Sequence, residues 1–409
     1  MTLQPGTDGS DTRAATGPMR GIRIVDFSIA LTGPYAAALL ADQGASVVKI
    51  ERPGIGDLAR WVGVSVNGIS SLFQACNRGK RSIAIDLTTD QGRDLARRFV
   101  SEADVVVQNF RPGVLDKLGL GYDALRVDHE DLVYVSLSGF GSVGPYAGKG
   151  AYDTVIQAYA GLASNQADAD GEPKFLHQTV ADKVTAMYAV QAITAALFAR
   201  ERGLGGQHVE LSMLDSVVSF LWADSAGNEM MLGADGSMPS SFVSTIRPFQ
   251  FIGGWGVCTP TSDSDFAGMC KALRVDGYDD PRVATIGNRR HAREMMADIM
   301  CRCHENAITM TIEEARARFA EFNSPFGEVV SPAQLSNDPH ARAIGLLEDS
   351  VHPTAGPIRQ PRHPAIFTST PAALAGPAPT LGQHSDELLG ELGFSADEIA
   401  ELRGSSIVS

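Results

Sequence analysis

"IRIVDFSIALTGPYAAALLADQGASVVKIE" (residues 22–51) decides the fold class of this chain. β-rich runs at 22–27 and 46–51 flank the helical stretch "PYAAALLADQG". Pro34 suits the first turn of a helix and Gly44 suits its end. The pattern is that of a β-α-β unit, in which the helix is the crossover that two parallel strands require.

The same alternation continues to about residue 213. Strands are predicted at 81–87, 104–110, 132–140 and 207–213. Helical segments separate them, including the amphipathic "TDQGRDLARRFVSEA" and the long apolar run after Val180. Continuous Val/Ile strands that alternate with helices predict an α/β fold with a parallel sheet covered on both faces. After about Leu232 the pattern changes to a loop-rich connector, a hairpin signal in "FQFIGGWGVCTP" and helical segments of a smaller α+β domain.

Bulk composition narrows the class of protein. The chain has 409 residues, which predicts at least two domains. Its net charge of −14 argues against nucleic acid as a partner. Five cysteines are too few and too scattered for a disulfide framework, so reduced thiols and a cytoplasmic location are expected. The sequence "CRCH" (301–304) lacks the spacing of a zinc site, and no metal is expected. The sequence predicts neither a signal peptide nor a membrane span.

The usual motifs of α/β enzymes are missing. The loop after the first strand is "SIALTGPY", not the glycine pattern of a dinucleotide fold, and the chain has neither a P-loop nor G-x-S-x-G. Basic residues instead recur near strand ends: Arg52, Arg60, Arg78, Lys80, Arg81 and Arg111. Ligands of open α/β sheets lie beyond the carboxyl ends of the strands, so Arg52 and Arg111 are placed to bind phosphate groups. Simple solvation of these loop arginines is the alternative.

Asp182 begins the long apolar run, and the residues alone leave two interpretations open. A helix start accounts for an aspartate there, because its carboxylate can cap the helix. The residues of this segment alone favour that interpretation, but a buried nucleophile accounts for the aspartate too, because burial makes a carboxylate more reactive.

Several segments together resemble the family III CoA-transferases, of the formyl-CoA and carnitine CoA-transferase type. They are "GIRIVDFSIALTGPYAAALLADQGASVVKIERPGIGDLAR", "NRGKRSIAIDLTTDQGRDLARRFVSEADVVVQNFRPGVLDKLGLGYDALR", "YDTVIQAYAGL", "ADKVTAMYAVQAITAALFARERGLGGQHVELSMLDSV" and "PTLGQHSDELLGELGFSADEI". The resemblance extends from about Gly21 to the end and is weaker between about 235 and 330. It implies that Asp182 is the catalytic carboxylate.

The resemblance also assigns roles to further residues. Those that would line the active site are Leu31, Thr32, Tyr152, Asp153 and Met213. Those that would contact CoA are Ala30, Arg52, Ile85, Asn109, Arg111, Lys117 and Leu118. The CoA thioester is a substrate, and no permanently bound cofactor is implied.

The implied architecture is a Rossmann-like large domain built from both chain ends, with an inserted small α+β domain, in an interlocked homodimer. The expected ranges are a disordered tail (1–20), the large CoA-binding domain (21–230), a linker with the small domain (231–344) and a C-terminal return to the large domain (345–409). The partners are an acyl-CoA, a carboxylic acid and a second copy of the chain, in organic-acid or fatty-acid metabolism.

The expected activity is acyl-CoA:carboxylate CoA transfer through mixed-anhydride and aspartyl-CoA thioester intermediates on Asp182. The first alternative is an α-methylacyl-CoA racemase, since the same fold hosts such enzymes with a histidine at the position of Tyr152. Tyrosine, with an ordinary pKa near 10, is a poor base at neutral pH. The second alternative is a CoA-thioester binder without turnover. The backbone N–H groups of "GGWG" (253–256) are a candidate for oxyanion binding.

Overall fold

The computed structural model describes residues 16–167, 170–233 and 241–409. They form two compact units: one runs to Ala223 and resumes over Gly345–Ser409, and the other is Asp224–Ile344. The sequence-based boundary between 230 and 231 therefore falls inside the second unit. Helix α9 (Met213–Trp222) is the last element of the first unit before this boundary, and its Leu221 belongs to an apolar cluster of that unit. The change in sequence composition at about Leu232 therefore comes several residues after the structural boundary.

The first unit is built on a six-stranded sheet in the order β5-β2-β1-β6-β7-β8, with every neighbouring pair parallel. Its strands are β1 (Arg23–Asp26), β2 (Ser46–Glu51), β5 (Arg81–Ala84), β6 (Val105–Gln108), β7 (Val133–Ser138) and β8 (Gln207–Ser212). The predicted parallel α/β sheet is confirmed. The strand order reverses between β1 and β6, and the crevice outside the carboxyl ends at such a point is where open α/β sheets bind ligands.

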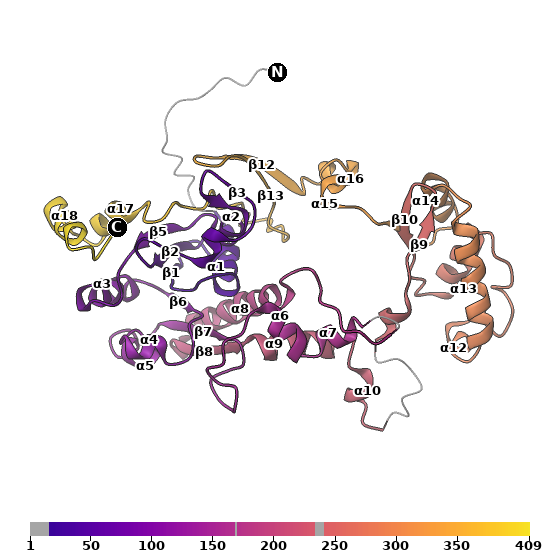
Figure 1. The fold of residues 1–409 in the computed structure, drawn as a ribbon, viewed down its shortest axis with the longest axis horizontal. Coiled ribbons are helices and arrows are strands. Elements are labelled where there is room, and N and C mark those ends of the chain that lie inside the picture. The colour runs from indigo at the N-terminus through magenta and orange to yellow at the C-terminus, as the bar shows by residue number, and fades with distance from the viewer. Residues whose placement is uncertain (1–15, 168–169, 234–240) are drawn as a thin grey trace, which may run out of the picture. The chain divides into compact units, whose positions relative to one another are not determined.

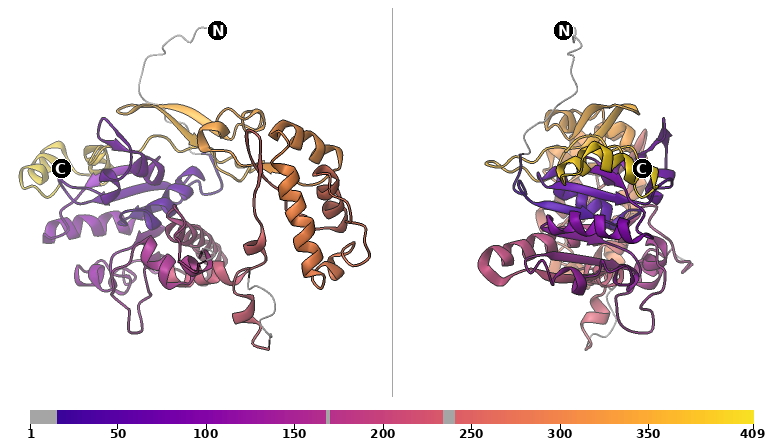
Figure 2. Two further views of the ribbon diagram at one scale, coloured as in Figure 1. Left: turned by 45° about the vertical axis from the view of Figure 1, so that its right-hand side comes forward. Right: turned by 90° about the vertical axis from the view of Figure 1, so that its left-hand side faces the viewer.

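Helices cover both faces of this sheet (Figure 1 and Figure 2). Side chains alternate across each strand, so Val105 and Val107 face one layer and Val106 faces the other. The layer on the first face contains α1 (Thr32–Asp42) and α8 (Val180–Ala199). The layer on the second face contains α3 (Asp90–Ser101), α4 (Val114–Lys117), α5 (Tyr122–Leu125), α17 (Ser385–Glu391) and α18 (Ala396–Gly404).

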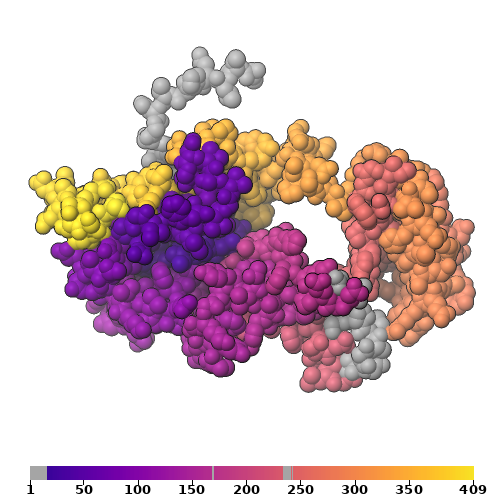
Figure 3. All heavy atoms as spheres, viewed as in Figure 1, coloured from indigo at the N-terminus to yellow at the C-terminus, as the bar shows by residue number. Residues whose placement is uncertain are grey.

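The C-terminal residues return to the first unit beside β5. Asp86 N donates to Ile407 O at 2.9 Å, and Ser409 N donates to Ala84 O at 3.2 Å. The space-filling view shows this yellow segment against the indigo and purple part of the chain (Figure 3). At the other end Met19, which falls in the range expected as a disordered tail (1–20), is buried in the core, and its N–H donates to Gln43 O at 2.9 Å. Residues 1–15 lie outside the described residues.

The remaining elements of the first unit are smaller. They are η1 (Leu58–Trp61), β3 (Ser65–Val66), β4 (Ile69–Ser70), α2 (Ser71–Asn77), α6 (Asp153–Tyr159), α7 (Leu162–Asn165), η2 (Arg200–Leu204), β12 (Leu347–His352) and β13 (Gly356–Pro361). The short helix α6 packs against α8 and α9, with Ile156 and Ala181 in one shared apolar cluster.

The second unit has its own apolar core, which includes Phe249, Phe266, Ile299 and Phe319. Its elements are α10 (Gly227–Met230), η3 (Phe242–Thr245), β9 (Phe249–Phe251), β10 (Gly254–Val257), α11 (Asp263–Ala272), α12 (Ile286–Arg289), α13 (Arg293–Ala307), α14 (Ile312–Glu321), β11 (Gly327–Glu328), α15 (Pro332–Leu335) and α16 (Pro339–Ala343). Among the residues that the structure describes, no helix has the length and apolar character that crossing a membrane requires.

Candidate active site

Asp182 lies in the first turn of α8 and is partly buried. Its Oδ1 accepts a hydrogen bond from the hydroxyl of Thr32, which lies in the first turn of α1, 150 positions away in the sequence. Helices α1 and α8 pack along each other through small side chains such as Ala37 and Ala189. This packing brings the two amino-terminal turns together, and the partial positive charge of a helix start favours an anion there.

The loop between β1 and α1, which leads into Thr32, is held by hydrogen bonds at Ile29 and Ala30. Ile29 N donates to Asn109 Oδ1 at 2.8 Å, and Asn109 Nδ2 donates back to Ile29 O at 2.7 Å. Ala30 has φ of +66°, a conformation that costs a non-glycine residue about 1–3 kcal/mol and persists only where the surroundings enforce it. Here Ala30 N donates to Asp57 Oδ1 at 2.8 Å. Because Asn109 follows β6, the loop is tied across the point where the strand order reverses.

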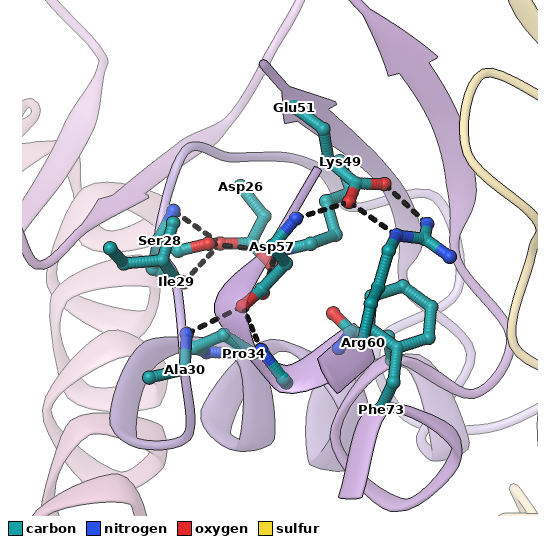
Figure 4. A network of polar contacts seen from close by, with 12 residues as sticks. Asp26, Ser28, Ile29, Ala30, Pro34, Lys49, Glu51, Asp57, Arg60 and Phe73 are labelled. Atoms are coloured by element: carbon teal, nitrogen blue, oxygen red, sulfur yellow. Dashed lines mark hydrogen bonds and ion pairs between the residues drawn. The ribbon is translucent and has the colours of Figure 1, made fainter. Parts of the chain in front are cut away.

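A buried network of charges contacts this loop (Figure 4). Lys49, which is fully buried, forms an ion pair with Asp57 at 2.8 Å, and its Nζ donates to Ser28 O at 2.7 Å. Asp26 is equally buried and pairs with Lys80 at 2.7 Å. Burial by itself would lower the pKa of Lys49, but Asp57 and Asp26 outweigh it and raise that pKa. Removal of one member of a buried pair typically costs about 3–5 kcal/mol, because it leaves the other charge buried without a partner.

Asp153, the first residue of α6, caps helix α8. Its Oδ1 accepts hydrogen bonds from Ala181 N at 2.7 Å and Asp182 N at 3.2 Å. Its Oδ2 accepts from Gln157 Nε2 at 2.5 Å, and the Gln157 amide is oriented in turn by Leu176 N, which donates to Oε1 at 3.0 Å. Asp153 therefore supplies the cap that Asp182 was one candidate to provide. The Asp182 carboxylate is left for another role.

The electrostatic setting of Asp182 also differs from that of a surface aspartate. Burial raises its pKa from 3.8 to about 6, and the neighbouring Asp153 adds to the increase. The Thr32 hydrogen bond and Lys183 act in the opposite direction. Such a carboxylate is mostly ionised at neutral pH and is more basic than an ordinary aspartate. It is therefore a better nucleophile.

The arginines expected to contact CoA phosphates lie on the surface. Arg52 follows β2, and Arg111 follows β6 close to Asn109. Both side chains are exposed, and neither forms an ion pair with another residue in the described ranges. A Cβ added to Gly150 would lie 2.9 Å from Arg111 Nη2, so the loop before α6 passes close to this guanidinium. Lys117, at the end of α4, is also exposed.

The other basic residues near strand ends form ion pairs with carboxylates of the same chain. Arg60 pairs with Glu51 at 2.7 Å. Arg78 pairs with Asp42 at 2.6 Å, and Arg81 pairs with Glu387 at 2.9 Å. Together with Lys80, these residues therefore have partners inside the chain.

The remaining residues that the resemblance singled out differ in exposure. Leu31, Ile85 and Met213 are buried apolar side chains, and Leu118 packs at the edge of the core. Their side chains therefore pack against other apolar side chains of the first unit. Tyr152 is 70% exposed at the start of α6.

The sequence reasoning missed three residues that shape the site: Lys49, Asp57 and Gln157. The sequence does give an indication for Lys49, because this lysine interrupts the apolar strand "VVKIE". A charged residue in a doubly covered strand must be buried, and a buried charge needs a partner. Asp57 and Gln157 gave no comparable signal, because polar residues in loops and short helices are ordinarily solvated.

A cavity of about 340 Å³ lies elsewhere in the first unit, over β6, β7 and β8. Gln108, Ser136 and His208 line it from adjacent strands, joined by hydrogen bonds of 2.8 Å through the Ser136 hydroxyl. They alternate along their strands with valines that face α1 and α8, so the cavity lies on the opposite face of the sheet from Asp182. None of the expected CoA-contacting side chains lines it.

Two other sequence features fall in the second unit. "GGWG" (253–256) forms part of the turn of the antiparallel β9–β10 hairpin and the first residues of β10, with Gly253 at φ of +90°. Cys301 and Cys303 lie on different sides of α13: the first thiol is exposed and the second is buried in the core. In the described ranges no group of three or more His, Cys, Asp or Glu side chains is arranged to hold a metal ion.

Comparison with known proteins agrees with this fold. The model of CoA-transferase family III matches residues 19–385. The chain is 33% identical over 399 residues to a succinate–glutarate CoA-transferase of Agrobacterium fabrum, covering 92% of this chain and 96% of that protein. It is 30% identical over 414 residues to a formyl-CoA:oxalate CoA-transferase of Escherichia coli O157:H7, covering 94% of this chain and 98% of that one.

Among solved structures, the chain is similar to a CAIB/BAIF family protein from Brucella suis. The TM-score is 0.78 at 31% identity, with 92% of this chain and 100% of the other covered. The similarity therefore extends through both units and includes the segments that position Thr32, Asp153 and Asp182. The chain belongs to CoA-transferase family III and is an enzyme of that family.

Proposed function

We propose that this enzyme transfers CoA from an acyl-CoA donor to a carboxylic acid, with Asp182 as the covalent nucleophile. The observation that carries the proposal is the state of the Asp182 carboxylate. It is partly buried, its pKa is raised to about 6, and the capping of α8 is done by Asp153 instead. A carboxylate whose structural task is performed by another residue is free to react.

In the first step a carboxylate oxygen of Asp182 attacks the thioester carbonyl of the donor. A C–O bond forms and the C–S bond breaks, which gives a mixed anhydride and CoA thiolate. The thiolate then attacks Cγ of Asp182, forms a C–S bond and releases the donor acid, which leaves an aspartyl-CoA thioester. The acceptor carboxylate repeats these steps in reverse. Covalent catalysis divides one difficult exchange into easier acyl transfers.

CoA would lie along the crevice at the carboxyl ends of β1, β2 and β6. The exposed guanidinium groups of Arg52 and Arg111 and the ammonium of Lys117 would bind its phosphates, since arginine matches phosphate oxygens with two parallel hydrogen bonds. The backbone around Ala30 and Asn109 would direct the pantetheine arm toward Asp182. The net charge of −14 offers no long-range attraction, so these local cations must supply the anion binding.

Racemisation of an α-methylacyl-CoA is the alternative activity. It needs one group to remove the α-proton and a second group to return it from the opposite face. In the described ranges the hydrogen bonds to Asp182 and Asp153 come from Thr32, Gln157 and backbone N–H groups, and none comes from a histidine. Together with tyrosine at position 152, this supports transfer over racemisation.

We further propose that the enzyme works as an interlocked homodimer in the cytoplasm. Large apolar side chains on α8 and α9 are exposed in the single chain, among them Met187, Phe198 and Phe220. Exposed apolar surface of this kind is typical of protein–protein interfaces. Light scattering of the purified enzyme tests the dimer, and a monomer at micromolar concentration would contradict it.

Covalent trapping tests the proposed activity. The enzyme is incubated with succinyl-CoA and glutarate, formyl-CoA and oxalate, or CoA thioesters of larger acids, then treated with hydroxylamine or borohydride and digested. A modified Asp182 in the mass spectrum is the expected result, and Asp182→Ala is the blank. Deuterium uptake at the α-carbon of the acyl group without modification of Asp182 would instead establish the racemase.

A further inference from the structure

The hydroxyl of Thr32 contacts an atom that takes part in the proposed reaction. Thr32 is 4% exposed, and its Oγ1 bonds to Oδ1 of Asp182. An ionised carboxylate can only accept, so the hydroxyl is the donor. No donor to the other oxygen, Oδ2, is found among the described residues, which leaves Oδ2 as the oxygen able to attack a thioester.

We propose that Thr32 is a catalytic residue, which stabilises the oxyanion that forms on Asp182 itself. The inference rests on the proposed function. In a CoA-transferase of this kind the carbonyl of the enzyme's own aspartyl group is attacked in every half-reaction. A donor aimed at that oxygen therefore acts in each half-reaction, whatever acyl group the substrate carries.

The bonding changes define the role. After Oδ2 has attacked the donor, Asp182 is an anhydride in which Oδ1 is the carbonyl oxygen. Attack of the CoA thiolate on Cγ forms the S–Cγ bond and moves the carbonyl electron pair onto Oδ1. Collapse of this tetrahedral intermediate restores the Cγ–Oδ1 double bond and breaks the Cγ–Oδ2 bond, and Oδ2 departs with the donor acid. The Thr32 hydroxyl donates to Oδ1 throughout, and its bond strengthens as charge gathers there.

The surroundings of Thr32 hold the hydroxyl in place before the reaction begins. The preceding loop is fixed at Ile29 by Asn109 and at Ala30 by Asp57. The next residue, Gly33, packs so closely on Ser28 that an added Cβ would lie 2.4 Å from the Ser28 side chain. A donor that need not reorient during the reaction is the kind that contributes most to catalysis.

Two other roles for Thr32 predict different results. If Thr32 only fills space, replacement by valine, which has the same shape, should leave kcat unchanged. If it only lowers the pKa of Asp182, loss of the hydroxyl should shift the acidic limb of the pH–rate profile upward and leave the rate at high pH unchanged. A role in oxyanion stabilisation lowers the rate at every pH.

The experiment compares Thr32→Val, Thr32→Ser and the wild-type enzyme, by the pH dependence of kcat and by trapping. Removal of one oxyanion donor typically lowers kcat by about 10²–10³-fold, so Thr32→Val is expected to lose about that much on the high-pH plateau. The yield of CoA thioester on Asp182 should fall with it. Thr32→Ser should retain most of the activity. Wild-type plateau activity in Thr32→Val would overturn the inference.

Two controls separate this result from trivial causes. Thr185→Val also removes a buried hydroxyl near the start of α8, one that donates to Ala181 O at 2.7 Å, and it should keep the wild-type plateau. Should Thr32→Val fail to fold, the pair Thr32→Ser and Thr32→Ala gives the same test, since these two differ only in the hydroxyl. Equal plateau rates for that pair would overturn the inference. Absence of any adduct on wild-type Asp182 would instead refute the proposed function.

Discussion

Asp153 and Asp182 each lie in the first turn of a helix, α6 and α8, yet their carboxylates have different partners. Asp153 is 5% exposed and accepts hydrogen bonds on both oxygens, from two backbone N–H groups and from Gln157. From the described part of the chain, Asp182 accepts one hydrogen bond, from the Thr32 hydroxyl, and burial raises its pKa to about 6. Two aspartates in the first turns of neighbouring helices thus differ in how many hydrogen-bond donors the fold brings to them.

The largest expected effect is the loss of turnover on neutralising the reactive carboxylate. Asp182→Asn should lower CoA-transfer activity by roughly 10⁴-fold or more, as removal of a covalent nucleophile does in other enzymes. Asp153→Asn should retain far more activity, because Asp153 acts on α8 and not on substrate. The measurement is kcat with one donor–acceptor pair for both variants. Equal losses in the two would remove the distinction between the carboxylates.

The next effect concerns stability, and here substitution of Asp153 should cost more than substitution of Asp182. Asp153→Ala leaves Ala181 N and Asp182 N without their acceptor and removes a partner of Gln157. The free energy of unfolding should fall by about 2–4 kcal/mol, the sum of a lost helix cap and unsatisfied buried groups. Urea denaturation followed by circular dichroism measures it. Asp153→Asn is the milder control, and a change below about 0.5 kcal/mol in Asp153→Ala would show that it is no cap.

A third prediction follows from the raised pKa of Asp182. The carboxyl group of Asp182 binds its proton more tightly in the folded protein than in the unfolded chain, where its pKa has the ordinary value of 3.8. The contribution of Asp182 to stability is therefore present below about pH 4 and lost as pH rises through about 6. Asp182→Asn removes the ionised form and should stabilise the fold at pH 8 by roughly 1–3 kcal/mol, with little effect at pH 4. Denaturation at both pH values checks the sign. A destabilised variant at pH 8 would mean that the ionised carboxylate supports the fold.

The smallest expected effect lies in the pH profile of the wild-type enzyme. The nucleophile must be ionised, so kcat/KM should fall about tenfold per pH unit below about pH 6. An ordinary aspartate would move that limb to about pH 4. Initial rates between pH 4.5 and 8.5 at constant ionic strength give the profile. A flat profile down to pH 5 would indicate that Asp182 is more solvated than its burial suggests.

Much of the fold could be read from local sequence pattern. The central strands of the sheet, β2, β1, β6 and β7, appear in the sequence as continuous Val/Ile runs separated by helical segments. That alternation predicted the parallel sheet. The helix start at Asp182 was equally local. Surface exposure was less predictable, because Arg78, Lys80 and Arg81 look like Arg52 and Arg111 in sequence but are paired with carboxylates distant along the chain. Arg60 is paired too, with the nearer Glu51.

By itself, the sequence determined the α/β class, the order of the elements, the family and the residue at the head of α8, because periodicity, turn residues and motif resemblance are properties of neighbouring positions. Only the tertiary structure decided which donors each carboxylate contacts. The contact between Thr32 and Asp182 and the cap from Asp153 to α8 join residues 150 and 28 positions apart. Whether a carboxylate is held by N–H groups or left to react depends on which distant donors the packing of α1, α6 and α8 brings to it, and no local pattern encodes that.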